Sequence, residues 1–146
     1  HKATSVNRSA ELEAILRAIP AGFNVYWYDE KRKLNGKGEE TNIQQYLADL
    51  YFADFVISVD TSAIHFREGI DRPALGLYTS FSAASRTKYY TATQSIDIQS
   101  PCDLQPCFFN KRTCPVMPKG DDFAPCLSSG NQYFTDTVKK QLTIML

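Results

Sequence analysis

A short polar group near the middle of the chain contains the residues best suited to chemistry. Asp60, Thr61 and Ser62 directly follow the apolar run Phe55–Val59, and His65 comes three residues later. Such a run is typical of a strand buried on both faces of a parallel sheet. The polar residues after it are good helix caps, so we predict strand, tight turn and helix in that order. The first N–H groups of a helix lack internal partners and carry partial positive charge, which suits a phosphate.

Each polar side chain at this turn has a role that fits its chemistry. Thr61 and Ser62 supply hydroxyl donors, and His65 lies one turn into the helix on the same side. Asp60 would repel a phosphate, so it is better suited to capping the helix or accepting a sugar hydroxyl. The same residues also fit a simpler interpretation, in which they form an ordinary cap and His65 is a half-buried helical residue.

A second apolar run, Ala74–Tyr78, predicts the next strand, and the intervening helix is expected over residues 63–68. Strand, helix and strand in this order form the repeating unit of an open α/β sheet. In such sheets, ligands bind at the carboxyl ends of the strands. Thr79 and Ser80 follow the second strand and are therefore expected to line the same crevice.

These segments resemble the donor-binding signature of the heptosyltransferase-like glycosyltransferases of family 9. In that family a strand ends in Asp-Thr-Gly, a histidine follows three residues after the glycine, and the next strand leads into a Gly-x-Thr turn. The matching positions here are residues 60–62, His65 and residues 71–80. Two positions depart from the family pattern: Ser62 replaces the glycine, and residues 79–81 replace the turn. Both glycines would let the backbone approach a diphosphate closely.

The resemblance implies the carboxyl-terminal, donor-binding half of a two-domain GT-B glycosyltransferase. The expected fold is α/β, with a Rossmann-like parallel sheet flanked by helices. The implied reaction transfers a sugar, most simply heptose from ADP-heptose, to a hydroxyl of lipopolysaccharide or of a protein. No metal is expected in the chemistry. The diphosphate of the nucleotide sugar would bind Thr61 and Ser62, with His65 in support and Asp60 orienting the turn.

The resemblance assigns no catalytic residue to this chain. The catalytic base of the family belongs to the amino-terminal acceptor domain, which is missing here. Alone, the chain is expected to bind nucleotide weakly and to transfer nothing. Two other classes of function stay open: a non-catalytic nucleotide-sugar-binding module, and a metal-stabilised interaction module with no ligand in the cleft.

The composition sets limits on the class of protein. A chain of 146 residues that is 43% hydrophobic can form one core, so we predict a single domain over residues 1–146. The 16 basic and 16 acidic residues balance, which argues against nucleic acid as the main partner. No apolar run approaches the roughly 20 residues of a membrane helix, and no signal peptide is recognisable. We expect a cytoplasmic protein, with peripheral association at the inner membrane as the alternative.

A cysteine-rich loop is predicted over residues 101–127, with four cysteines and several prolines: Cys102, Cys107, Cys114 and Cys126. A secreted disulfide scaffold would spread its cysteines along the chain, so the clustering favours a metal site or a local staple. A similar loop follows the last sheet strand in many members of the resembled family, and some of them hold iron on four cysteines. Zinc, iron and two disulfides all stay open. A structural role is expected, because four protein ligands leave no open catalytic position.

The remaining patterns predict the elements around this centre. They indicate a helix over residues 10–19 capped by Ser9, a strand over residues 24–28, a helix from a Thr41 cap to about residue 51, an edge strand over residues 91–99 and a carboxyl-terminal helix over residues 135–146. Between the last two strands, Arg86 and Lys88 are candidates to neutralise a diphosphate. Tyr89 and Tyr90 either pack or stack on a base, and packing is the simpler interpretation.

Overall fold

The computed structural model describes residues 10–29, 34–35, 39–79, 81–98, 114, 116 and 124–146. In chain order, its elements are α1 (Leu12–Leu16), β1 (Tyr28–Asp29), β2 (Leu34–Asn35), α2 (Ile43–Phe52), β3 (Val56–Val59), α3 (Ser62–Gly69), β4 (Ala74–Tyr78), α4 (Ala83–Thr87), β5 (Thr93–Asp97), the 3₁₀ helix η3 (Pro125–Leu127) and α5 (Gln132–Met145).

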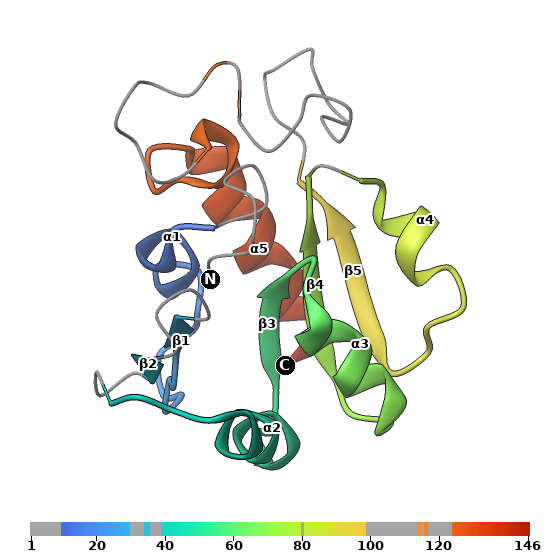
Figure 1. Ribbon diagram of the computed structural model, residues 1–146. Coiled ribbons are helices and arrows are strands. Elements are labelled where there is room, and N and C mark those ends of the chain that lie inside the picture. The colour runs from blue at the N-terminus through green and yellow to red at the C-terminus, as the bar shows by residue number, and fades with distance from the viewer. Residues whose placement is uncertain are drawn as a thin grey trace.

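Strands β3, β4 and β5 form a parallel sheet in the order in which they occur in the chain. Val56 pairs with Ala74, which in turn pairs with Thr93. Parallel neighbours require a crossover connection, and here α3 and α4 provide the two crossovers (Figure 1). The predicted α/β fold with a parallel sheet flanked by helices is therefore confirmed, and the three strands match part of a Rossmann-like sheet.

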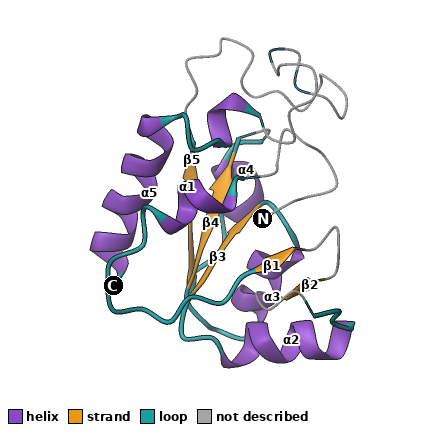
Figure 2. Cartoon of the chain, turned by 90° about the vertical axis from the view of Figure 1, so that its left-hand side faces the viewer, coloured by secondary structure: helices purple, strands orange, loops and turns teal. Residues whose placement is uncertain are grey.

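Helices cover both faces of this sheet. Figure 2 shows α5 on one side of the strands and α2 and α3 on the other. The larger core cluster joins α1, α5 and one face of the sheet, and its fully buried side chains include Val59, Leu75, Leu77, Phe134, Val138 and Leu142. The smaller cluster lies between α2 and α3 and contains Tyr46, Leu50 and Ala63. Every residue of β4 is buried because this strand lies in the middle of the sheet.

A buried arginine connects α3 to the end of α2 and to the segments that lead into β3 and β4. Arg67 of α3 is 0% exposed. Its guanidinium donates to the carbonyl oxygens of Leu50 at 2.6 Å, Ala53 at 2.9 Å, Asp54 at 3.2 Å and Pro73 at 2.9 Å. These carbonyls belong to the end of α2 and to the segments that lead into β3 and β4. The planar, five-donor guanidinium is suited to bridging several acceptors at once.

Helix α3 ends in a Schellman motif. The N–H of Asp71 donates to the carbonyl of Glu68, and the N–H of Arg72 donates to the carbonyl of Arg67, both at 3.0 Å. The motif needs a left-handed residue, and Asp71 adopts a φ of 54°. Glycine is the usual choice at this position because it has no Cβ to strain the backbone.

Helix α2 differs from its prediction in its cap. Asn42, rather than Thr41, is the N-cap, and its side chain accepts from the N–H of Gln45 at 2.9 Å. Ile43 is 65% exposed, whereas Tyr46 is buried. The Tyr46 ring packs against Tyr28, with ring centroids 4.6 Å apart, so an aromatic contact forms part of the buried face of this helix.

The expected strand over residues 24–28 is wrong. Residues 23–27 lie outside any strand, and Tyr28–Asp29 pairs with the antiparallel β2 instead of extending the main sheet. Tyr28 is held by its ring contact with Tyr46, and its hydroxyl accepts from Thr41 Oγ1 at 2.5 Å. The side chains before it, such as Phe23 and Val25, are exposed, so burial does not stabilise an extended pairing there.

The terminal helices also differ from their predicted bounds. The first spans only Leu12–Leu16, and Glu11 is its N-cap, while Ser9 lies outside the described residues. Ala14 and Ile15 form its buried face, whereas Leu16 is exposed. The last helix begins at Gln132, three residues earlier than expected, because Asn131 caps it through a hydrogen bond to the N–H of Phe134.

We expect Arg67→Met to lower the free energy of unfolding by about 3 kcal/mol or more, because it leaves several buried carbonyls without a donor while keeping an apolar stem of similar length. Urea denaturation measures this change. Arg17→Met is the matched control: Arg17 forms an exposed ion pair with Glu13, so its replacement should lower the free energy of unfolding by less than about 0.5 kcal/mol. Equal effects of the two substitutions would contradict the assigned role of Arg67.

We expect Asp71→Gly to raise the free energy of unfolding by about 0.5 kcal/mol, since glycine adopts the left-handed conformation without strain. Asp71→Ala keeps a Cβ at the same φ, so its free energy of unfolding should be lower than that of the wild type. Thermal unfolding of the three proteins tests the order Gly, Asp, Ala; a different order would show that the conformation of residue 71 does not limit stability.

Candidate functional site

The predicted turn after β3 is present, and Thr61 forms the N-cap of α3. Its Oγ1 accepts from the N–H of Ala63 at 3.4 Å and lies 2.9 Å from Oγ of Ser58. The hydroxyl of Thr61 is therefore used within the protein. Of the two hydroxyls predicted to meet a phosphate, this one serves the helix itself.

Ser62 is the first residue of α3, and its side chain is exposed. Within the part of the chain that the structure describes, neither its N–H nor its hydroxyl makes a hydrogen bond. An N–H at the first helical position has no intrahelical acceptor, and the helix dipole makes it a good donor to an anion. Ser62 thus offers two adjacent donors at the carboxyl end of β3.

Asp60 and Thr79 directly follow β3 and β4 at the carboxyl ends of these strands. The register places Val59 beside Leu77, so Asp60 lies beside Tyr78, the residue before Thr79. Asp60 is only 9% exposed, and Thr79 is buried as well. Their predicted positions at the strand ends are therefore as expected, although both side chains are largely enclosed. Ser80, the last member of the predicted set, lies outside the described residues.

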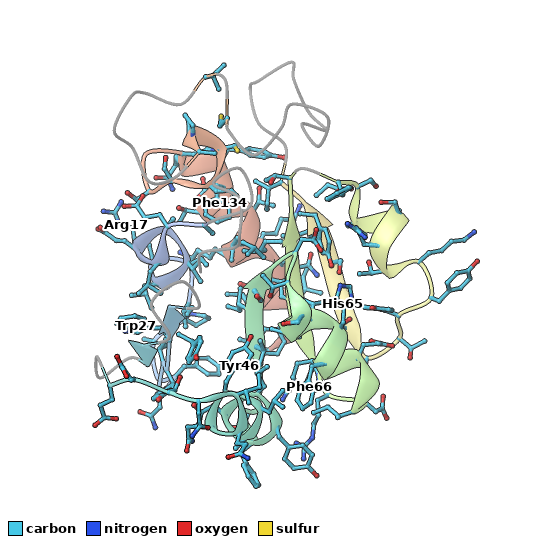
Figure 3. All side chains as sticks on the ribbon, viewed as in Figure 1. Arg17, Trp27, Tyr46, His65, Phe66 and Phe134 are labelled. Carbon is cyan, nitrogen blue, oxygen red and sulfur yellow. The ribbon has the colours of Figure 1, made fainter. Side chains whose placement is uncertain are left out.

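His65 lies one turn into α3, and its side chain is exposed rather than half-buried. Its Nδ1 is hydrogen-bonded to the hydroxyl of Tyr90, and the two rings meet edge to face at 5.8 Å and 87°. Figure 3 shows His65 on α3, beside the segment that follows α4. Ser62 and His65 are three residues apart and so lie on the same face of the helix.

Tyr78 is a buried residue of the site that the sequence did not single out. Its hydroxyl makes no hydrogen bond to any described residue, and neither does the buried Oγ of Ser95. A Cβ added at Gly76 would lie 2.7 Å from Cε2 of Tyr78 and 3.0 Å from that Oγ, so the glycine leaves room for the ring. Burial raises the pKa of Tyr78 well above its usual range, and the nearby charge of Asp60 raises it further.

The segment around α4 carries two cations, each close to an aromatic ring. The guanidinium of Arg86 stacks on the ring of Phe81 at 4.1 Å, and the ammonium of Lys88 lies 5.4 Å from the ring of Tyr89. Tyr89 is 84% exposed, so the packing interpretation is wrong for this residue. Tyr90 packs, but on His65, a partner that the sequence did not suggest. The Asp97 carboxylate accepts from the N–H of Ala83 and caps α4.

Glu68 fixes the segment that leads into β5. Its carboxylate accepts from the N–H groups of Thr91 at 2.8 Å, Ala92 at 3.1 Å and Thr93 at 2.9 Å, and also from the Thr93 hydroxyl at 3.1 Å. Burial by itself would raise the pKa of Glu68, but these hydrogen bonds to the charged form outweigh it and lower the pKa. Helix α3 is therefore bonded at one end to the segment preceding the third strand.

The cysteine predictions fall mostly on undescribed parts of the chain. Cys102 and Cys107 lie outside the described residues. Cys114 and Cys126 are half-buried and are not joined by a disulfide, and Cys126 lies in η3 against the larger core cluster. Among the residues that can be described, no group of three or more His, Cys, Asp or Glu side chains is arranged to hold a metal ion. A structural metal or two disulfides on the four cysteines stay predictions.

Comparisons with known proteins identify no relative. The sequence matches no family model, and neither a curated protein nor a solved structure matches the chain. Within the described residues, no helix is both long and apolar enough to cross a lipid bilayer.

We expect the stabilising effect of Glu68 to depend on pH. Because its pKa is lowered in the folded state, the contribution is present above about pH 4.3, the ordinary glutamate value, and is lost as the pH falls through the folded pKa. Glu68→Gln removes the charge and one acceptor oxygen. Urea midpoints should differ clearly between wild type and variant at pH 7 and converge near pH 3. A constant difference across this range would contradict the prediction.

Proposed function

We propose that this chain is the donor-binding domain of a glycosyltransferase and that it holds the diphosphate of a nucleotide sugar at the start of α3. The observation that carries the proposal is that the N–H and the hydroxyl of Ser62 make no hydrogen bond to a described residue and lie at the carboxyl end of a parallel strand. This is the position at which open α/β sheets bind their ligands, and a helix N-terminus there favours a phosphate.

Neighbouring side chains support an anionic ligand at this position. His65 is exposed on the same face of α3 as Ser62 and can add a ring N–H donor. Arg86 is exposed on α4 and can supply positive charge. Asp60 is 9% exposed, so its enclosed carboxylate is suited to orient the turn rather than to meet a phosphate.

The assignment to a glycosyltransferase rests on the resemblance of residues 60–62, His65 and residues 71–80 to the donor-binding signature of family 9. The residues that match are the strand end, the first helical turn and the following strand of one parallel βαβ unit. In such an enzyme, negative charge develops on the leaving diphosphate during sugar transfer. Oriented N–H groups at the helix start would stabilise that charge.

In this proposal the chain is one half of a GT-B fold, and an amino-terminal acceptor domain supplies the catalytic base. The donor is a nucleotide-diphosphate sugar, with ADP-heptose as the first candidate, and the acceptor is a hydroxyl of lipopolysaccharide or of a protein. A non-catalytic module would bind the nucleotide without transferring a sugar. Serine in place of the family's glycine at position 62 fits this alternative as well.

Ser62→Pro tests the site directly, because it removes the N–H that is proposed to bind phosphate. Proline is well tolerated at the first helical position, and the extended conformation of Thr61 (φ −140°, ψ 173°) suits a residue before proline. Calorimetry with ADP should show about a tenfold loss of affinity for this variant. Ser62→Ala keeps the N–H and loses only the hydroxyl, so its affinity for ADP should fall about threefold.

Two controls make this experiment decisive. Thermal unfolding of both Ser62 variants should stay close to that of the wild type, which shows that α3 is intact. Adenosine, which lacks phosphates, should bind equally to all three proteins. If ADP binds the proline variant as tightly as the wild type, or does not bind the wild type at all, the start of α3 is not a diphosphate site.

A further inference from the structure

The contact between His65 and Tyr90 has a specific chemical consequence. The hydroxyl of Tyr90 is bonded to Nδ1 of His65, and the two rings meet almost perpendicularly at 87°. The Tyr90 hydroxyl makes no other hydrogen bond to a described residue. A single hydroxyl therefore holds the ring of an exposed histidine in one orientation on the same face of α3 as Ser62.

Two proton arrangements are compatible with this contact in the neutral histidine. If Nδ1 carries the proton, Tyr90 accepts, its own hydroxyl proton has no acceptor among the described residues, and Nε2 is a bare acceptor. If Tyr90 donates to Nδ1, its proton is used and the histidine proton must be on Nε2. The second arrangement uses every donor of the pair and leaves an N–H as the only polar group that the ring presents.

We infer that Tyr90 is a positioning residue for the proposed anion site, because its O–H donates to Nδ1 of His65 and fixes the ring as an N–H donor at Nε2. This inference rests on the proposed function. In a helix, side chains lean toward the N-terminus, so the ring at position 65 is directed toward the turn that carries Ser62. An N–H donor there complements the phosphate oxygens, whereas a bare nitrogen would repel them.

A second polar group, the Tyr78 hydroxyl, is buried on β4 without a hydrogen-bond partner among the described residues. The Tyr78 ring lies back over Gly76, close to Oγ of Ser95, so it is directed along the strand and into the protein. The donors that the start of α3 presents on the surface are therefore those of Ser62 and His65.

The test combines NMR of the histidine ring with binding of pyrophosphate to the whole chain. Long-range ¹H–¹⁵N correlation spectra distinguish the two tautomers of His65, and the only other histidine is His1, which a His65→Ala variant separates. We expect the Nε2–H tautomer in the wild type. In Tyr90→Phe the two tautomers should mix, and pyrophosphate affinity should fall about threefold to tenfold.

Tyr89→Phe is the matched control, since Tyr89 is adjacent in the chain but exposed, and its hydroxyl makes no hydrogen bond to a described residue. It should leave the tautomer and the affinity unchanged. The double variant His65→Ala/Tyr90→Phe should bind pyrophosphate no more weakly than His65→Ala alone, because Tyr90 acts only through the ring. A structural role for Tyr90 would instead give additive losses.

The possible failures are distinguishable. An Nδ1–H tautomer in the wild type, or a Tyr90→Phe variant that behaves like Tyr89→Phe, overturns the inference. If the wild type binds no pyrophosphate, the proposed function fails at this site and the ligand-directed role of Tyr90 fails with it. The tautomer spectra then still decide whether Tyr90 fixes the proton on the ring.

Discussion

The buried guanidinium of Arg67 is the interaction on which the arrangement of the sheet and helices most depends. It donates to four carbonyls that belong to the end of α2 and to the segments entering β3 and β4. Burial lowers the pKa of Arg67, the charge of Arg72 lowers it further, and Asp54 opposes both. Because arginine stays charged in proteins, this buried group needs acceptors. The four carbonyls serve its two terminal nitrogens, while Nε makes no hydrogen bond to a described residue.

Adjacent positions on one helix therefore fix the amino-terminal edge of the whole sheet. Arg67 binds carbonyls before two strands, and Glu68 binds N–H groups before the third. The side chains that anchor the strands by hydrogen bonds thus lie in the second half of α3, while Ser62 and His65 in the first half are exposed. This division lets a single short helix both hold the sheet together and present polar groups at the opposite edge.

The sequence predicted the central unit well because its signals are local. The apolar runs before Asp60 and Thr79 and the polar residues between them specify strands and a cap by short-range physics. The predictions failed where contacts between residues far apart in the sequence determine the structure. The aromatic segment before Tyr28 reads as a strand, but that tyrosine packs against Tyr46 instead. Likewise, no periodic pattern indicates that Tyr90, 25 residues further along the chain, meets His65.

The sequential order of β3, β4 and β5 has a consequence for how the chain folds. The bonds of Arg67 join residues 6 to 17 positions apart, and those of Glu68 join residues 23 to 25 apart, so the sheet closes only short loops. The contact between Glu11 and Ser129 instead spans 118 residues. We expect the parallel unit to assemble first and the two terminal helices to dock later. Pulsed hydrogen exchange would then show amides of β4 protected before those of α5.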